Sequence, residues 1–215
     1  MPSRTPKPGA LIVTIDGPAG AGKSTTAKLL ARTLGLTYLD TGATYRALAY
    51  SAIQAKVVIT DVPRLVRLAK TLPLKFVAVP EGPQRVFLHW LDVTHAIRSE
   101  EVSEAAALIS QYPGVRAAMV QRQRQLANRH GVVVEGRDTG SVVFPHATYK
   151  FFLDAPAGVR ARRRQRELSK LYGAEPPLVQ VQEQLHFRDG LDRSRVVGPL
   201  VKPPGAITIN TSRHT

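Results

Sequence analysis

The chain has 215 residues, of which 43% are hydrophobic and 21% charged, a composition that excludes a disordered protein and is typical of a globular one. It contains no cysteine, which excludes disulfide bonds, thiolate zinc sites and a cysteine nucleophile. Thirty lysines and arginines against sixteen acidic residues give a net charge of +14, so we expect an anionic partner, either nucleic acid or a phosphorylated small molecule.

The sequence has no pattern of a membrane span or of a signal peptide. No apolar run approaches the roughly 18–20 residues that a membrane helix needs. Residues 1–9 are basic and rich in proline, without an apolar core. We therefore expect a cytoplasmic protein with no membrane partner.

Strands and helices alternate in the first part of the chain. Residues 11–15 form a short β-branched apolar run that predicts a buried strand, and a glycine-rich turn follows it. Residues 23–34 have apolar side chains at helical spacing and end before Gly35, which suits the end of a helix. A second strand at 38–39 and a second helix at 45–54 come next. This alternation predicts a parallel sheet with helices on both faces.

The middle of the chain has a different pattern. A short helix from 61 to 72, capped by Asp61, precedes two alternating runs at 74–79 and 85–91. The Glu-Gly-Pro sequence at 81–83 separates these runs and predicts a hairpin. We therefore expect an inserted subdomain over about 69–108.

Helices and buried strands return in the remainder of the chain. Helical sequence resumes at Ser99, breaks at Pro113 and continues to about Asn128. Three further buried strands and two polar helices are predicted, the strands at 132–134, 149–153 and 207–209 and the helices at about 156–171 and 177–193.

Residues 17–24 match the phosphate-binding pattern G-x-x-x-x-G-K-[ST] in full, with the predicted strand before it and the predicted helix after it. The glycines allow successive backbone N–H groups to face one anion at a helix N-terminus. Lys23 can reach the β- and γ-phosphates of ATP, and the Ser24 hydroxyl can bind Mg²⁺. The predicted ATP site consists of Gly17, Pro18, Ala19, Gly20, Ala21, Gly22, Lys23, Ser24 and Thr25.

Two further segments carry a resemblance to a known family. Residues 41–46, Thr-Gly-Ala-Thr-Tyr-Arg, follow the second strand, and residues 135–140, Glu-Gly-Arg-Asp-Thr-Gly, follow the strand at 132–134. In this order and spacing they resemble bacterial cytidylate kinases, and the resemblance extends to about Arg195. It implies an α/β P-loop nucleoside monophosphate kinase fold in a single kinase domain over 1–215. Residues 69–108 would be the insert that binds the monophosphate, and about 157–175 a short helical lid.

The resemblance implies phosphoryl transfer from ATP, with Mg²⁺, to CMP or dCMP, by a monomer with no specific nucleic-acid partner. One alternative is another small-molecule P-loop kinase, of the UMP/CMP or shikimate type. A second is a non-catalytic P-loop protein that binds nucleic acid through its basic surface. A kinase is favoured because the arginines occur at motif positions on several elements and not along one stripe.

The resemblance also implies which residues bind the acceptor nucleotide. Arg46 and Arg137 would bind phosphate, Asp138 would accept the N4 amino group of cytosine, and Arg116 would donate to O2 and N3. The alternatives are an ordinary amphipathic helix around Arg46 and a turn with a local ion pair around Asp138. The implied acceptor-binding set is Thr41, Tyr45, Arg46, Arg116, Arg137, Asp138, Arg188, Asp192 and Arg195.

Catalysis is expected to come from cations. Three arginines of the predicted lid share one helical face by their i, i+3 and i+4 spacing, although a solvated basic face would have the same pattern. Glu135 would hold Mg²⁺ through water together with Ser24, or else would only orient Arg137 or Lys23. The implied catalytic residues are Lys23, Arg160, Arg163, Arg164 and Arg195.

The chain departs from the family in three places. Ala107 stands where the family usually has a serine near the base, so Ser103, Ser110 or a water would take that role. Gly190 and Leu191 replace a more usual Asp-Arg pair. The family typically adds a final helix after the last strand, where this chain ends at Thr215.

Overall fold

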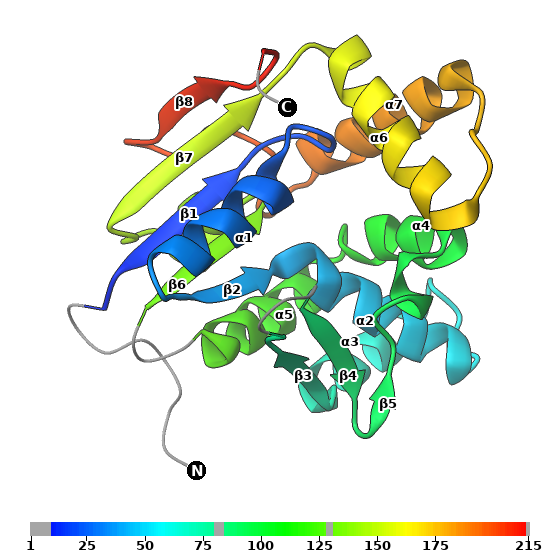
Figure 1. The fold of residues 1–215 in the computed structure, drawn as a ribbon. Helices are drawn as coiled ribbons and strands as arrows, with labels where there is room; N and C mark the ends of the chain where they lie inside the picture. Colours follow the sequence, from blue (N-terminus) through cyan, green and yellow to red (C-terminus); the bar gives the residue numbers. More distant parts are fainter. Residues whose placement is uncertain (1–9, 80–83, 128–130, 214–215) are drawn as a thin grey trace. The chain divides into compact units, whose positions relative to one another are not determined.

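The computed structural model describes residues 10–79, 84–127 and 131–213. These form two compact units, each of which folds around its own sheet. We call the described residues of 10–39 and 131–213 the sheet unit, and the described residues of 40–127 the middle unit. Both units are drawn in Figure 1. None of the described helices has the length and hydropathy to cross a membrane.

The sheet unit is built on five strands in the order β2-β6-β1-β7-β8. β1 pairs in parallel with β6 and β7, and β7 pairs in parallel with β8. The strands are β1 (Ile12–Asp16), β2 (Thr37–Asp40), β6 (Val132–Gly136), β7 (Tyr149–Asp154) and β8 (Ile207–Asn210). The helical elements are α1 (Lys23–Thr33), the π-helical turn η2 (Thr139–Val143), α6 (Ala157–Tyr172) and α7 (Leu178–Ser194).

The core of the sheet unit follows from the apolar strands that the sequence predicts. Val13 and Ile15 of β1 and Val133 of β6 are buried against Ala27 and Ala31 of α1. The small alanines allow α1 to pack closely on the sheet. The helix ends at Thr33 with Leu34 as its C-cap, and Gly35, the next residue, has a φ of 65°, as expected for a glycine just past the end of a helix.

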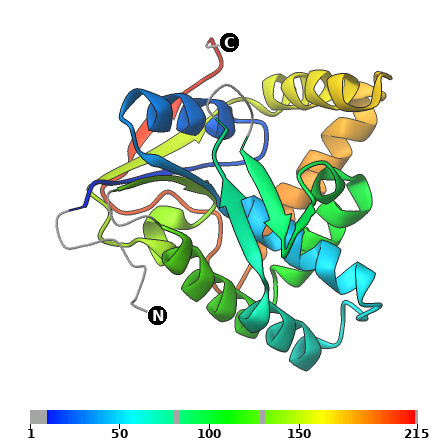
Figure 2. The ribbon, with the colours of Figure 1, turned by 60° about the horizontal axis from the view of Figure 1, so that its bottom comes forward.

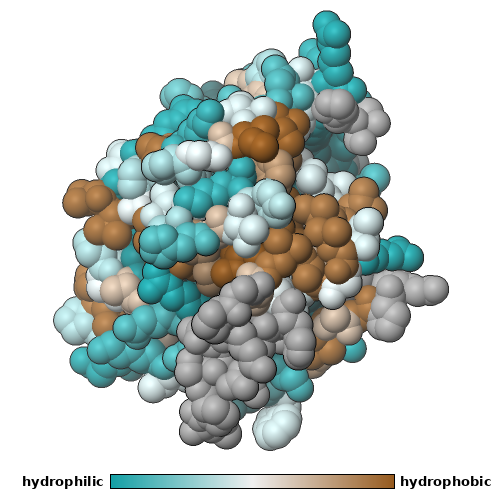
Figure 3. Space-filling model, turned by 90° about the vertical axis from the view of Figure 1, so that its left-hand side faces the viewer, coloured by the Kyte–Doolittle hydropathy of each residue, from teal (hydrophilic) through white to brown (hydrophobic). Residues whose placement is uncertain are grey.

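Two large apolar side chains on the last two strands of this sheet remain partly exposed. On β8, Ile207 keeps 58% of its surface accessible, and Tyr149 at the start of β7 keeps 54%. Figure 3 shows the face at the left of Figure 1, where apolar groups lie among hydrophilic ones.

The middle unit combines four α-helices and the 3₁₀ turn η1 with an antiparallel sheet in the order β3-β4-β5 (Figure 2). Its core includes Leu48, Leu65, Ile97 and Met119, each at most 1% exposed. The elements are α2 (Thr41–Gln54), α3 (Val62–Thr71), β3 (Leu74–Val77), β4 (Arg85–Leu88), β5 (Leu91–Asp92), η1 (Ala96–Arg98), α4 (Glu100–Ile109) and α5 (Pro113–Leu126).

The observed elements confirm the predicted parallel sheet with helices and the small antiparallel sheet. Two details differ from the sequence expectation. α2 begins at Thr41 and not at Tyr45, because the Asp40 side chain accepts a hydrogen bond from the Ala43 N–H and caps the helix there. β5 is an additional strand, paired with β4. The turn at 81–83 lies outside the described residues, and the separate insert over 69–108 stays a prediction.

Candidate active site

The phosphate-binding loop connects the carboxyl end of β1 to the N-terminus of α1. Gly17, Gly20 and Gly22 have φ values of 148°, 75° and 87°, a region that side chains with a Cβ rarely adopt. At Gly17 a Cβ would also lie 2.0 Å from the carbonyl oxygen of Leu153. These glycines therefore shape a loop whose N–H groups precede a helix N-terminus, which is an arrangement that binds phosphate.

Lys23 lies folded back into this loop. Its side chain is buried, and Nζ donates a hydrogen bond to the Pro18 carbonyl oxygen 2.7 Å away. Burial and, next, repulsion from Arg137 lower the pKa of Lys23 to about 7, although Glu135 favours the charged form. The negative charge of bound phosphates would favour the protonated form of Lys23 and raise its pKa.

Two carboxylates lie at the carboxyl ends of neighbouring strands. Asp16, at the end of β1, accepts hydrogen bonds of 2.8 Å from the N–H and hydroxyl of Thr139 and from the N–H of Gly140. Burial raises the pKa of Asp16 despite these bonds. Asp16 therefore holds the turn that directly follows Arg137 and Asp138. Glu135, on β6, accepts from the hydroxyl of Tyr38 on β2.

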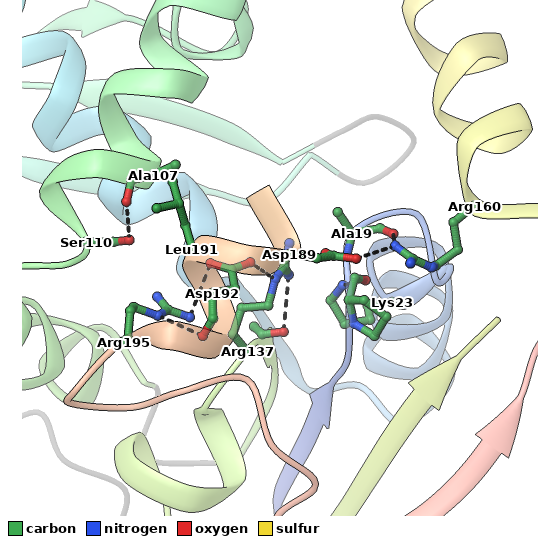
Figure 4. Close-up of polar contacts among 12 residues, drawn as sticks. Ala19, Lys23, Ala107, Ser110, Arg137, Arg160, Asp189, Leu191, Asp192 and Arg195 are labelled. Atoms are coloured by element: carbon green, nitrogen blue, oxygen red, sulfur yellow. Dashed lines mark hydrogen bonds and ion pairs between the residues drawn. The ribbon is translucent and has the colours of Figure 1, made fainter. Parts of the chain in front are cut away.

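A buried ion-pair network lies beside the loop, formed by Arg137, Asp192 and Arg195 (Figure 4). Arg137 Nε is 2.7 Å from Asp192 Oδ2, and Arg195 Nη2 is 3.3 Å from Asp192 Oδ1. Burial alone would raise the pKa of Asp192, but the charges of the surrounding arginines, Arg137 first and Arg195 next, together lower it. The charge of Arg188 also acts on Asp192. This network carries more positive than negative charge, as a phosphate site requires.

The three predicted lid arginines all lie on α6 and contact different partners. Arg160 pairs with Asp189 of α7 at 2.7 Å. Arg163 donates to the hydroxyl and the carbonyl of Thr211, which follows β8. Arg164 pairs with Glu167 at 2.9 Å on the surface of the same helix.

The acceptor-binding residues predicted from the segments of the middle unit lie on α2 and α5. Arg46 forms an ion pair of 2.8 Å with Asp40. Burial would raise the pKa of Asp40, but the charge of Arg46, the hydrogen bond from the Ala43 N–H and the charge of Arg98 together lower it. Arg116 is 1% exposed, its guanidinium lies 5.7 Å from the centre of the Tyr45 ring, and Nη1 donates to the Ser110 carbonyl. Thr41 is buried at the start of α2.

Ser110 is one of the residues that could take the role of the serine that Ala107 replaces. The Ser110 hydroxyl donates to the Ala107 carbonyl oxygen at 2.8 Å (Figure 4). A serine hydroxyl has a single proton to donate, so in this arrangement Ser110 can offer a base only its lone pairs.

The predicted site residues of the sheet unit therefore lie in three places. They lie in the phosphate-binding loop and the start of α1, at the carboxyl end of β6, and on α6 and α7 or directly after them. Sequence reasoning did not single out four residues that hold these groups. Asp189 had a weak signal, since it follows Arg188 in a charge-rich helix, and so did Asp16, which precedes the first loop glycine. Tyr38 and Thr211 had no signal.

The oxygen donors near the loop fit Mg²⁺. Ser24 follows the loop lysine and is exposed at the start of α1, and Glu135 is the next-to-last residue of β6, the strand that pairs with β1. Over the described ranges, no group of three or more His, Asp or Glu could hold a metal. Mg²⁺ that is bound mainly through ATP phosphates and water needs only such a sparse set of protein ligands.

Known proteins resemble this chain over almost its full length. The family model described as cytidylate kinase matches residues 13–215. A cytidylate kinase from Desulfitobacterium hafniense is 45% identical over 202 residues, which are 94% of this chain and 86% of that protein. Relatives of the same name from Geobacillus sp. and Pelotomaculum thermopropionicum are 45% and 46% identical over 200 residues, 93% of this chain and 88% of each protein. The similarity therefore includes both compact units.

Proposed function

This chain belongs to the cytidylate kinase family. We propose which of its residues bind ATP, which bind the acceptor and which act on the transferred group in the phosphorylation of CMP and dCMP by ATP. The observation that carries the proposal is the complete phosphate-binding loop with Lys23 buried beside the Arg137–Asp192–Arg195 network. ATP and CMP together bring about six negative charges, and these cations offset their repulsion.

ATP would bind through residues 17–25, with Lys23 on its β- and γ-phosphates. Arg163 and Arg164 would stabilise the transferred phosphoryl group together with Arg195. Arg160 is predicted from the resemblance to share this role. Ser24 and Glu135 would hold Mg²⁺. When bound, the metal neutralises phosphate charge.

The reaction itself asks little covalent chemistry of the protein. An oxygen of the CMP phosphate forms a bond to the γ-phosphorus, and the bond from that phosphorus to the β–γ bridging oxygen breaks, which releases ADP. The second pKa of a phosphate monoester is about 6, so the attacking oxygen is already ionised at neutral pH and no general base is needed. The protein acts by alignment and charge neutralisation.

The acceptor would be bound by Thr41, Tyr45, Arg46, Arg116, Arg137, Asp138, Arg188, Asp192 and Arg195. Asp138 would read the base, because an ionised carboxylate accepts from the N4 amino group of cytosine but meets the O4 acceptor of uracil with a lone pair. That the enzyme acts as a monomer in the cytoplasm stays a prediction.

Asp138→Asn should lower the preference for CMP over UMP, measured as the ratio of kcat/KM values, by about tenfold or more. The asparagine amide can donate to uracil O4 as well as accept from cytosine N4. The preference between CMP and dCMP should stay unchanged, which is the internal control. An unchanged CMP-to-UMP ratio would remove Asp138 from base recognition.

The proposed function is tested by ADP release from Mg·ATP with CMP, dCMP, UMP, AMP or shikimate as the acceptor. Release with CMP and dCMP should exceed release with all the others. Turnover of UMP equal to that of CMP would contradict the role of Asp138 in base recognition. No ADP release with any acceptor would contradict the kinase assignment for this chain.

A further inference from the structure

The middle of the phosphate-binding loop is held by an ion pair between two helices. The Ala19 N–H donates to Asp189 Oδ1 of α7 at 3.3 Å, and the Ala19 carbonyl accepts from Arg160 Nη1 of α6 at 3.0 Å. Arg160 Nη1 also lies 2.7 Å from Asp189 Oδ2 (Figure 4). Both backbone polar groups of Ala19 are therefore bound by the Arg160–Asp189 pair.

Apolar packing also holds the phosphate-binding loop close to α6. The Ala19 side chain is buried in a cluster with Ala161 of α6 and Val181 and Leu185 of α7. At Gly20, a Cβ would lie 2.7 Å from the Arg160 carbonyl oxygen. The loop motif does not require glycine at this position, but the contact with α6 does.

A second arginine of α6 reaches the loop through Thr211. The Thr211 hydroxyl oxygen lies 3.0 Å from the Ala21 carbonyl oxygen, and Arg163 Nη1 donates to that hydroxyl at 3.0 Å. Arg160 and Arg163 are one helical turn apart. The two loop alanines on either side of Gly20 are thus tied to the same face of α6.

The Arg160–Asp189 pair is buried, with side-chain exposures of 10% and 5%. A buried ion pair is weak evidence for stability, because an apolar pair of similar volume is often as stable. What an apolar pair cannot do is bind the N–H and the C=O of Ala19. The pair is therefore placed to fix the shape of the loop.

We propose that Asp189 and Arg160 are positioning residues that hold the loop, at Ala19, in the shape that binds the ATP phosphates. The role of Asp189 is assigned by these contacts. For Arg160, the hydrogen bonds to Ala155, Ala19 and Asp189 favour this role over direct action on the transferred group. The inference rests on the proposed use of the loop for ATP.

Two variants of the full chain test the proposal. Asp189→Asn keeps the shape of the side chain but has only one acceptor oxygen. It therefore cannot accept from the Ala19 N–H with one atom and from Arg160 with the other. The double variant Arg160→Met with Asp189→Leu removes both charges together, so that no buried charge is left without its partner. Glu167→Gln is the matched control, because it removes the exposed partner of Arg164 from the same helix.

The readouts are steady-state kinetics and calorimetric binding of the non-hydrolysable analogue AMP-PNP. Both test variants should weaken AMP-PNP binding and raise the KM for ATP about tenfold, while the KM for CMP changes by less than about twofold. Glu167→Gln should change each constant by less than about twofold.

Wild-type AMP-PNP affinity in the folded double variant would overturn the proposal, since the pair would then only stabilise the fold. A loss of kcat with unchanged AMP-PNP affinity would also overturn it, since Arg160 would then act on the transferred group. If Asp189→Asn does not fold, the double variant decides. Failure of the wild type to phosphorylate CMP would instead contradict the proposed function. The AMP-PNP affinities of the variants would still test the role of the Arg160–Asp189 pair, because they do not depend on CMP.

Discussion

Lys23→Met should lower kcat for CMP phosphorylation by about 100-fold or more while the fold remains intact. Lys23 lies inside the loop, where its ammonium can approach the phosphates between which the bond breaks. Methionine has a similar length but no charge, so the developing negative charge loses its partner. The measurement is ADP release at saturating ATP and CMP.

Lys28→Met is the matched control for this variant. Lys28 lies on the same helix α1 but is exposed, with Nζ 5.7 Å from the centre of the Tyr38 ring. Its loss should change kcat by less than about threefold. Turnover by Lys23→Met within the range of this control would contradict the assignment of the loop lysine.

The stability of the Lys23→Met variant should show the cost of burying the lysine. Burial and Arg137 lower the pKa of Lys23 to about 7 in the folded protein, whereas the unfolded chain keeps a pKa of about 10.4. Between these values the unfolded state binds more protons, so the stability of the wild type relative to the variant should rise with pH. The slope is at most about 1.4 kcal/mol per pH unit.

Urea unfolding of the two proteins from about pH 7 to about pH 9 measures this difference. The variant should be at least as stable as the wild type at about pH 7, and its advantage should shrink as the pH rises. A variant that is less stable at about pH 7, with no change across the window, would show that Lys23 is charged and well paired in the folded protein.

Asp192→Ala should destabilise the folded protein by about 3–5 kcal/mol, because it leaves two buried arginines without their shared carboxylate. The side chains of Arg137, Asp192 and Arg195 are 17%, 8% and 4% exposed. Glu167→Ala is the control, since it removes an ion pair in which Glu167 is 51% exposed, and it should cost less than about 1 kcal/mol. Free energies of unfolding in urea measure both.

The contribution of Asp192 should also depend on pH. Its pKa is lowered in the folded protein, so this contribution is present in full above the unfolded pKa of about 3.9 and is lost as the pH falls through the folded pKa. The difference in stability between wild type and Asp192→Asn should therefore narrow only below about pH 4. Equal costs for Asp192→Ala and Glu167→Ala would contradict the buried network.

The sequence by itself determined the elements whose signals are local. The loop at 17–24 is specified by glycines that alone adopt its backbone angles, between an apolar strand and a helix. The helix after Asp61 begins where predicted, because the Asp61 side chain accepts from the Arg64 N–H three residues later. Such interactions join residues within one turn of each other, and the sequence displays them directly.

Only the tertiary structure decided which charged groups meet. Asp189 and Ala19 are 170 residues apart, and Asp16 and Thr139 are 123 apart. Helical spacing shows that Arg160 and Arg163 share a face, but not that this face reaches the phosphate-binding loop. The lowered pKa of Lys23 likewise depends on burial and on Arg137, which lies on a different strand end. These properties arise when distant segments pack together, because burial and charge proximity are set by the whole fold and not by the local chain.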